Sequence, residues 1–266
     1  MKGMALPLIT EMPEPKFVMS GDGFRIATYS WGDPDAPAVL CVHGFASSCR
    51  DNWAATGWVR DLTRAGFRVL GIDQRGHGAS EKPHEPDDFS MEHLVSDLES
   101  VLDTYLVEEF SYLGYSLGAR VGWHAAVALP HILERAVLGG IPDGKPLGRI
   151  DLAQAHAYLD QGTKVTDPDT INYVRLAERV PGNDLRSLIA LAEGMRFDDD
   201  DPDLGDPPQQ RILFATGSKD SIVEQSRHLA EASPQGYFYE IPGRQHFNAP
   251  GSRDFRAAGL EFLGIR

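Results

Sequence analysis

The pentapeptide Gly114-Tyr115-Ser116-Leu117-Gly118 constrains this chain more than any other segment, because of the residues on either side of it. The apolar run 110–113 before it is typical of a strand, and the small residues 119–122 after it favour a helix. A strand that turns sharply into a helix strains the backbone of the central residue, and the two glycines leave room for such a turn. We therefore predict that the Ser116 hydroxyl is exposed above a sheet, beside a helix N-terminus that favours negative charge.

A serine hydroxyl becomes a good nucleophile only when an adjacent base takes its proton, and that base needs an acid to orient it. His246 follows the strand-like segment 237–241, and Asp220 follows the buried-strand segment 211–215. Both residues thus lie in loops after the carboxyl ends of predicted strands, where open α/β sheets place their ligands. Asp143, which follows the apolar segment 136–138, is an alternative acid.

These features resemble the α/β-hydrolases, and specifically a capped serine esterase or lactonase. The resemblance rests on the blocks 42–45 (Val-His-Gly-Phe) and 73–80 (Asp-Gln-Arg-Gly-His-Gly-Ala-Ser), on the serine turn, and on the chain order serine, aspartate, histidine. It implies a catalytic triad of Ser116, Asp220 and His246. The segment 216–220 resembles the acid loop of that family, so Asp220 is preferred over Asp143.

The same resemblance implies an oxyanion hole made of two backbone N–H groups, those of Leu117 and Phe45, with Ala46 as an alternative to Phe45. Neither a metal ion nor an organic cofactor is implied. Tyr115, beside the serine, and Trp53 are predicted to line the substrate pocket. Packing of Trp53 beneath its loop is an equally good interpretation.

The pattern of the chain predicts an α/β fold, with a mostly parallel twisted sheet and helices on both of its faces. Segments 17–20 and 24–31 indicate a hairpin around a Gly-Asp-Gly turn, and 38–42 is a continuous apolar run typical of a strand buried on both faces. Apolar residues at three- and four-residue intervals predict a helix over 90–107 with Ser90 as its cap. Strands and helices that alternate at this spacing need crossover connections.

The alternation stops after Pro142. Residues 143–208 show three helical patterns (150–159, 167–180 and 183–195) and no strand, and they end in an acidic, proline-rich stretch. We interpret them as a helical cap inserted into a core of residues 1–142 and 209–266. The start signals are Asp167-Pro168 and Asn183. The run 198–203 is interpreted as a solvated return linker, since it lacks the ligand spacing of a calcium loop.

Other polar residues have structural interpretations. Asp73 and Arg75 are expected to pin their turn through hydrogen bonds and a local ion pair. His43 and His77 lie in glycine-rich turns, where a histidine is more often structural than catalytic. The cap helices offer mainly apolar side chains, which suits an apolar acyl or alcohol part of a substrate.

Composition excludes some classes of partner. Lys plus Arg number 25 and Asp plus Glu number 39, a net charge of −14, which argues against nucleic acid or anionic membranes as partners. The first residues lack the apolar core of a secretory signal, and the two cysteines form no disulfide framework, so a cytoplasmic protein is expected. The oligomeric state is not predictable from the sequence.

The expected activity is hydrolysis of a small or medium carboxylic ester or lactone. A serine in the turn disfavours the related epoxide hydrolases and haloalkane dehalogenases, which the resemblance associates with an aspartate nucleophile. Three alternatives remain open: hydrolysis of a carbon–carbon bond in a ring-cleavage product, a perhydrolase activity, and a receptor that closes its cap on a small ligand.

Overall fold

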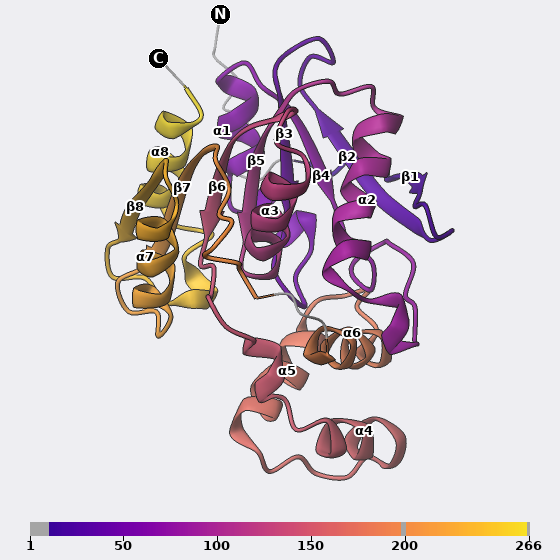
Figure 1. Cartoon of the computed structure of the whole chain (residues 1–266). Coiled ribbons are helices and arrows are strands. Elements are labelled where there is room, and N and C mark those ends of the chain that lie inside the picture. The colour runs from indigo at the N-terminus through magenta and orange to yellow at the C-terminus, as the bar shows by residue number, and fades with distance from the viewer. Residues whose placement is uncertain (1–10, 198–200, 265–266) are drawn as a thin grey trace, which may run out of the picture.

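The protein is described here by a computed structural model that covers residues 11–197 and 201–264. Within these ranges one eight-stranded sheet has the order β1-β2-β4-β3-β5-β6-β7-β8 (Figure 1). The strands are β1 (Lys16–Met19), β2 (Arg25–Trp31), β3 (Ala38–Val42), β4 (Arg68–Ile72), β5 (Phe110–Tyr115), β6 (Leu133–Gly139), β7 (Arg211–Gly217) and β8 (Gly236–Ile241). The β1–β2 and β2–β4 pairs are antiparallel, and the other five pairs are parallel.

Burial follows this topology. Every residue of β3 and β5 is buried, because helices cover both faces of the parallel part of the sheet. The edge strand β1 instead leaves Phe17 and Met19 exposed. The predicted hairpin and the mostly parallel sheet are thus confirmed.

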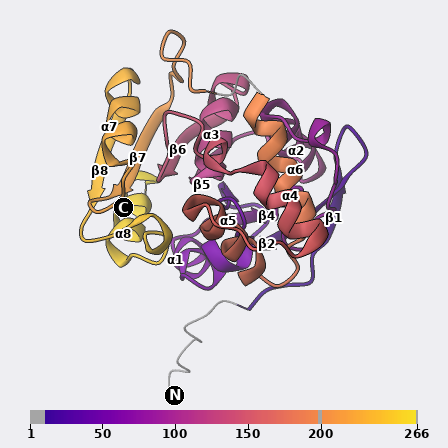
Figure 2. The ribbon, with the colours of Figure 1, turned by 90° about the horizontal axis from the view of Figure 1, so that it is seen from below.

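Helices cover both faces of the sheet (Figure 2). One face carries α2 (Met91–Thr104), α3 (Leu117–Ala128) and α7 (Val223–Ala232), and the other carries α1 (Trp58–Arg64) and α8 (Arg253–Phe262). Short helical turns, η1 (Arg50–Ala54), η2 (Pro86–Asp88) and η4 (His246–Asn248), lie in the loops.

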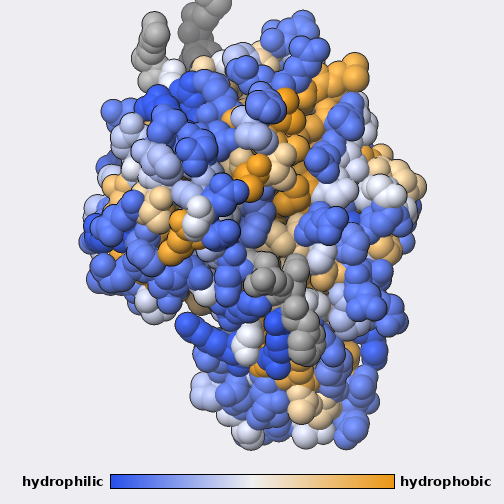
Figure 3. Space-filling view, viewed as in Figure 1, coloured by the Kyte–Doolittle hydropathy of each residue, from blue (hydrophilic) through white to orange (hydrophobic). Residues whose placement is uncertain are grey.

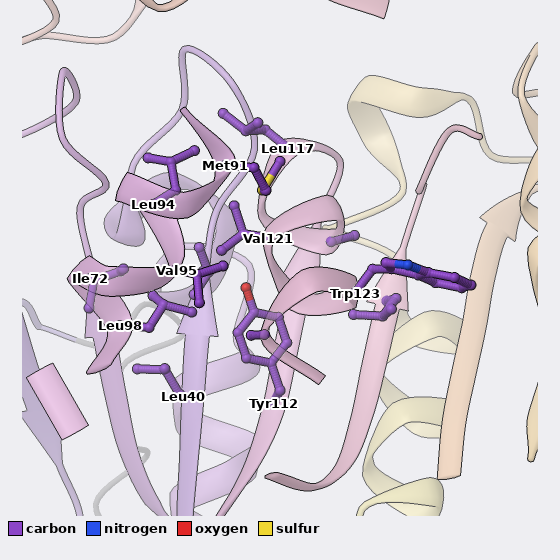
Figure 4. Close-up of a cluster of buried hydrophobic side chains, with 14 of the residues drawn as sticks. Leu40, Ile72, Met91, Leu94, Val95, Leu98, Tyr112, Leu117, Val121 and Trp123 are labelled. Carbon is purple, nitrogen blue, oxygen red and sulfur yellow. The ribbon is translucent and has the colours of Figure 1, made fainter. Parts of the chain in front are cut away.

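The α2–α3 layer shows how the apolar periodicity becomes a core. The Ser90 hydroxyl accepts a hydrogen bond from the backbone N–H of His93, which caps α2 as predicted. Leu94 and Leu98 of α2 then face Val121 of α3 across a buried cluster (Figure 4). Truncating one such leucine to alanine typically costs about 2–5 kcal/mol of folding free energy.

Between β6 and β7 the described residues form helices and no strand. These are η3 (Pro146–Arg149), α4 (Leu152–Gln161), α5 (Pro168–Arg179) and α6 (Leu185–Phe197), which we call the cap. The cap lies beyond the carboxyl ends of the parallel strands, and its surface in the view of Figure 3 is largely hydrophilic. Its boundaries at residues 143 and 208 stay predictions. Residues 198–200 of the acidic linker and residues 1–10 lie outside the described ranges.

The predicted helix starts in the cap have different outcomes. The Asp167 carboxylate caps α5, and Pro168 is its first residue, as predicted. The prediction for Asn183 is wrong: α6 begins at Leu185, where the Asp184 carboxylate accepts hydrogen bonds from the backbone N–H groups of the first turn. Asn183 contacts the core instead, as described below.

The prediction that Arg75 pairs locally with Asp73 is also wrong. The buried Arg75 guanidinium forms bidentate hydrogen bonds to Asp97 on α2 and to Asp22 in the hairpin turn, with ion-pair distances of 2.7 Å to each. The Asp73 carboxylate accepts hydrogen bonds from the Tyr29 hydroxyl and from the N–H groups of Cys49 and Ala79. The long arginine side chain therefore joins three segments, while the aspartate pins the turn.

No helix in the described ranges is long and apolar enough to cross a membrane.

Candidate active site

The turn at Ser116 has the strained backbone that the sequence predicts. Ser116 has φ +54° and ψ −114°, directly after β5 and at the start of α3. A Cβ atom on Gly114 would lie 2.4 Å from the carbonyl oxygen of Gly118, and one on Gly118 would lie 2.2 Å from that of Val42. Only glycine fits at either position, so this packing holds the serine above the sheet.

Three side chains converge there from the ends of three strands. The Ser116 Oγ lies 3.0 Å from Nε2 of His246, and Nδ1 of His246 lies 2.8 Å from Oδ2 of Asp220. A carboxylate on Nδ1 selects the tautomer with its proton there, which leaves Nε2 to accept the serine proton. Asp143 is not part of this series of hydrogen bonds; its carboxylate lies 3.7 Å from Nδ1 of His228.

Tyr115 holds the histidine loop. Its hydroxyl donates a 2.5 Å hydrogen bond to the carbonyl oxygen of His246, and the two rings lie 5.4 Å apart. Burial raises the pKa of the Tyr115 phenol well above its usual value, so the hydroxyl keeps the proton that it donates. Tyr115 also lines the cavity above Ser116. The residue beside the serine therefore fixes the loop that carries His246 and also forms part of the cavity wall.

The loop 44–46 beside the serine is fixed by hydrogen bonds. The N–H of Gly44 donates to Oδ1 of Asn52 at 2.9 Å, and the N–H of Ala46 donates to Nε2 of His77, also at 2.9 Å. Burial lowers the pKa of His77 to about 3, so its imidazole is neutral and can accept. The Ala46 N–H is thus occupied, whereas those of Phe45 and Leu117 have no acceptor among the described residues.

Asn183 connects the cap to this loop. Its Nδ2 donates to the carbonyl oxygen of Ala46 at 3.0 Å, and its Oδ1 accepts from the N–H of Gly78 at 3.3 Å. Ala46 has φ +55°, an unusual conformation for alanine, and it is buried against Ala177 and Leu188 of the cap. Sequence reasoning missed Asn183 and Asn52 as site residues, because their partners are backbone groups that leave no sequence pattern.

A cavity of about 270 Å³ opens over Ser116. Phe45, Tyr115, Leu117 and His246 line its floor, and α5 lines its roof. The roof residues recur at three- and four-residue intervals along one face of α5: Asp169, Asn172, Tyr173, Leu176 and Arg179. Tyr173 packs edge-on against Phe45, with ring centroids 5.6 Å apart. Three of these five side chains are charged or carry an amide, and the cap also contributes the apolar residues Pro146, Leu147 and Met195 to the lining.

Trp53 is not part of this wall. Its side chain is fully buried on the face of the sheet that α1 and α8 cover, and it packs edge-on against Trp58, with ring centroids 6.1 Å apart. The prediction that Trp53 contacts substrate is therefore wrong, and the interpretation as packing beneath the loop is correct.

Residues 37–172, just over half of the chain, match the family described as alpha/beta hydrolase fold. The chain belongs to this family. The α/β-hydrolase fold also appears in a solved enol-lactonase from Burkholderia xenovorans LB400, which superposes with a TM-score of 0.76 at 20% identity and covers 93% of this chain and 99% of that one. At this identity the likeness shows the fold alone.

Two curated α/β-hydrolase relatives differ in how much of them this chain spans. Epoxide hydrolase A of Mycobacterium tuberculosis is 34% identical over 107 residues, 39% of this chain and 31% of that protein. The sn-1-specific diacylglycerol lipase ABHD11 of Mus musculus is 25% identical over 263 residues, 87% of this chain and 82% of that protein. The chain thus spans less than a third of the epoxide hydrolase, and the relatives carry different activities on one fold.

Proposed function

We propose that this α/β-hydrolase cleaves small or medium carboxylic esters or lactones through an acyl-enzyme on Ser116. The observation that carries the proposal is the hydrogen-bonded chain Ser116–His246–Asp220, which lies at the floor of the cavity. A serine with a base and an orienting acid is the arrangement that acyl transfer requires.

In the proposed reaction, the Ser116 oxygen attacks the ester carbonyl while Nε2 of His246 takes its proton. The tetrahedral intermediate collapses, the imidazolium returns the proton to the leaving alkoxide, and the alcohol departs. A water molecule deprotonated by His246 then attacks the acyl group. The second tetrahedral intermediate collapses to the carboxylic acid, and the imidazolium returns the proton to the Ser116 oxygen. Asp220 stabilises the positive charge that His246 carries in both steps.

The developing oxyanion would be held by the N–H groups of Leu117 and Phe45. Leu117 is the first residue of α3, so its N–H has no partner within the helix and the helix dipole adds to its effect. One such donor typically lowers the activation barrier by about 3 kcal/mol. No step needs a metal ion or an organic cofactor.

The identity of the nucleophile separates this proposal from epoxide hydrolysis. Ser116 occupies the turn where the family resemblance associates epoxide hydrolases with aspartate. An alkyl-enzyme formed on serine would be an ether, which water does not readily cleave, whereas an acyl-enzyme on serine is an ester that hydrolyses. Serine chemistry therefore supports acyl substrates.

Turnover of p-nitrophenyl acetate and butyrate tests the proposal, in a panel with a lactone, an epoxide and a ring-cleavage dienone. We expect steady release of nitrophenol and loss of turnover in Ser116→Ala. Ser100→Ala, which removes a hydroxyl on α2, is the matched control. Cleavage of the dienone or the epoxide but of no ester would contradict the proposal, and labelling of one site without turnover would indicate a receptor.

A further inference from the structure

The charges around the cavity differ in sign from those of the molecule. The net charge is −14, yet four cationic residues line the cavity, namely Arg120, Lys145, Arg149 and Arg179. The acidic lining residues are Asp169 and Asp220, and the Asp220 carboxylate is hydrogen-bonded to His246. The molecule as a whole repels anions at long range because it is acidic. The cations at the proposed catalytic cavity would attract an anionic group there.

Two of these cations are available to a ligand. Arg120 is buried and donates to the carbonyl oxygen of Gly144 and to the Asp201 carboxylate. Arg149 and Arg179 are exposed, and neither makes a hydrogen bond or ion pair with any described residue. Both residues line the cavity, and the described residues of the protein accept no hydrogen bond from their guanidinium groups.

The backbone that carries Arg149 is held in place. The Arg196 guanidinium donates to the carbonyl oxygens of Gly148 and Ile150, on either side of Arg149. The Tyr173 hydroxyl donates to the carbonyl oxygen of Pro146 at 3.2 Å, which ties η3 to α5, the helix that ends at Arg179. The segments that carry the two arginines are thus fixed relative to each other before a ligand arrives.

Tyr173, which joins η3 to α5, also connects the two arginine-bearing segments to the proposed reaction centre. Tyr173 packs against Phe45, whose N–H is a proposed oxyanion donor. A substrate with its carbonyl at Ser116 would extend past Tyr173 toward the arginines. A guanidinium binds a carboxylate through two parallel hydrogen bonds, and its planar shape favours this anion.

We infer that the substrate is an ester or lactone that carries a carboxylate away from the scissile bond, bound by Arg149 and Arg179. The inference rests on the proposed esterase function, and it narrows the substrate class from esters and lactones in general to those that carry a carboxylate.

Matched ester pairs test the inference. The first pair is p-nitrophenyl hydrogen glutarate and its methyl ester, with the carboxylate on the acyl side. The second is 4-butyryloxybenzoate and its methyl ester, with the carboxylate on the leaving group. In at least one pair we expect a higher kcat/KM for the acid, a preference that weakens as salt is added. Arg149→Gln and Arg179→Gln should each reduce this preference about tenfold, the lower end of the range for a charged hydrogen bond, because both residues are exposed.

Arg175→Gln is the control, because Arg175 is exposed on the same helix α5 but does not line the cavity. It should keep the wild-type preference. If no acid is preferred in either pair, or if the preference survives both arginine substitutions, the inference is wrong.

A binding measurement separates this failure from failure of the esterase proposal. Ser116→Ala should bind the preferred acid more tightly than its methyl ester, and the difference should disappear when Arg149 and Arg179 are also replaced by glutamine. Turnover of neutral esters without this binding difference would leave the esterase proposal intact and overturn the carboxylate site. Binding that depends on the two arginines, without ester turnover by the wild type, would support the carboxylate site and overturn the esterase proposal.

Discussion

Asp220 illustrates how a single side chain defines the proposed chemistry. Its carboxylate is almost fully buried, with 2% of the side chain exposed, and it accepts from His246 and from the N–H of Ile222. A buried carboxylate in this position fixes the tautomer of the imidazole and stabilises its charged form. Asp143 lies in the neighbouring loop but contacts His228 instead.

Replacing each acid in turn distinguishes the two. Asp220→Asn should lower kcat for p-nitrophenyl butyrate by about 10³–10⁴, because an amide can present its donor to Nδ1 and favour the wrong tautomer. Asp143→Asn should leave kcat within about twofold. A large loss in the Asp143 variant, with Asp220→Asn close to wild type, would show that the acid comes from the other loop.

At the scale of elements, the loop that leads into α6 meets the loop that carries Phe45. The Asn183 side chain reaches the carbonyl oxygen of Ala46 and the N–H of Gly78, while Asp184 caps α6. Two adjacent residues thus have separate tasks, since one fixes the proposed oxyanion loop and the other fixes the helix.

Asn183→Ala should lower kcat by about tenfold and change KM little, because a shifted Phe45 N–H stabilises the oxyanion less well. Asp184→Ala is the matched control: it should cost about 1 kcal/mol of folding free energy and leave kcat close to wild type. Kinetics and urea denaturation of both variants measure the two effects. Equal loss of kcat in both variants would mean that Asn183 acts only through the stability of the cap.

The sequence predicted those elements whose signals are local. The periodicity of α2, the apolar run of β3 and the turn at Ser116 depend on neighbouring residues, so they could be read directly. The Arg75–Asp97 pair and the role of Asn183 could not, because each depends on packing between segments far apart in the chain. For Trp53 the sequence left burial and a place in the pocket as equal interpretations, and packing against Trp58 decided between them. The residues of α5 that line the cavity were unpredictable for the same reason.

At the scale of the whole molecule, two buried neutral histidines make stability depend on pH. Burial lowers the pKa of His43 to about 4 and that of His77 to about 3, from an ordinary value of 6.5. The unfolded chain therefore binds more protons than the folded one below about pH 6.5. Stability is full above that pH and falls as the pH drops toward 4 for His43 and toward 3 for His77.

Urea denaturation at pH 7, 6 and 5 should show this fall, with a limiting slope of about 1.4 kcal/mol per pH unit for each histidine. Burial raises the pKa of Asp22, but hydrogen bonds from Arg75 and Ser20 outweigh it and lower the pKa to about 2. Protonation of Asp22 therefore destabilises the fold only at lower pH, between about 4 and 2. The fall between pH 7 and 5 therefore reports on the histidines, against an opposing contribution from Asp97, whose pKa burial raises. Equal stability at pH 7 and pH 5 would contradict the assignment of His43 and His77 as neutral.

The most direct test of the central claim is to trap the acyl-enzyme. p-Nitrophenyl trimethylacetate has a crowded acyl group that leaves serine slowly, so mixing it with the protein should release one nitrophenolate per chain in a rapid burst. Peptide mass spectrometry after an acid quench should then find the trimethylacetyl group on Ser116. A chain that turns over esters without a burst, or that carries the acyl group on another residue while Ser116→Ala remains active, would contradict the account.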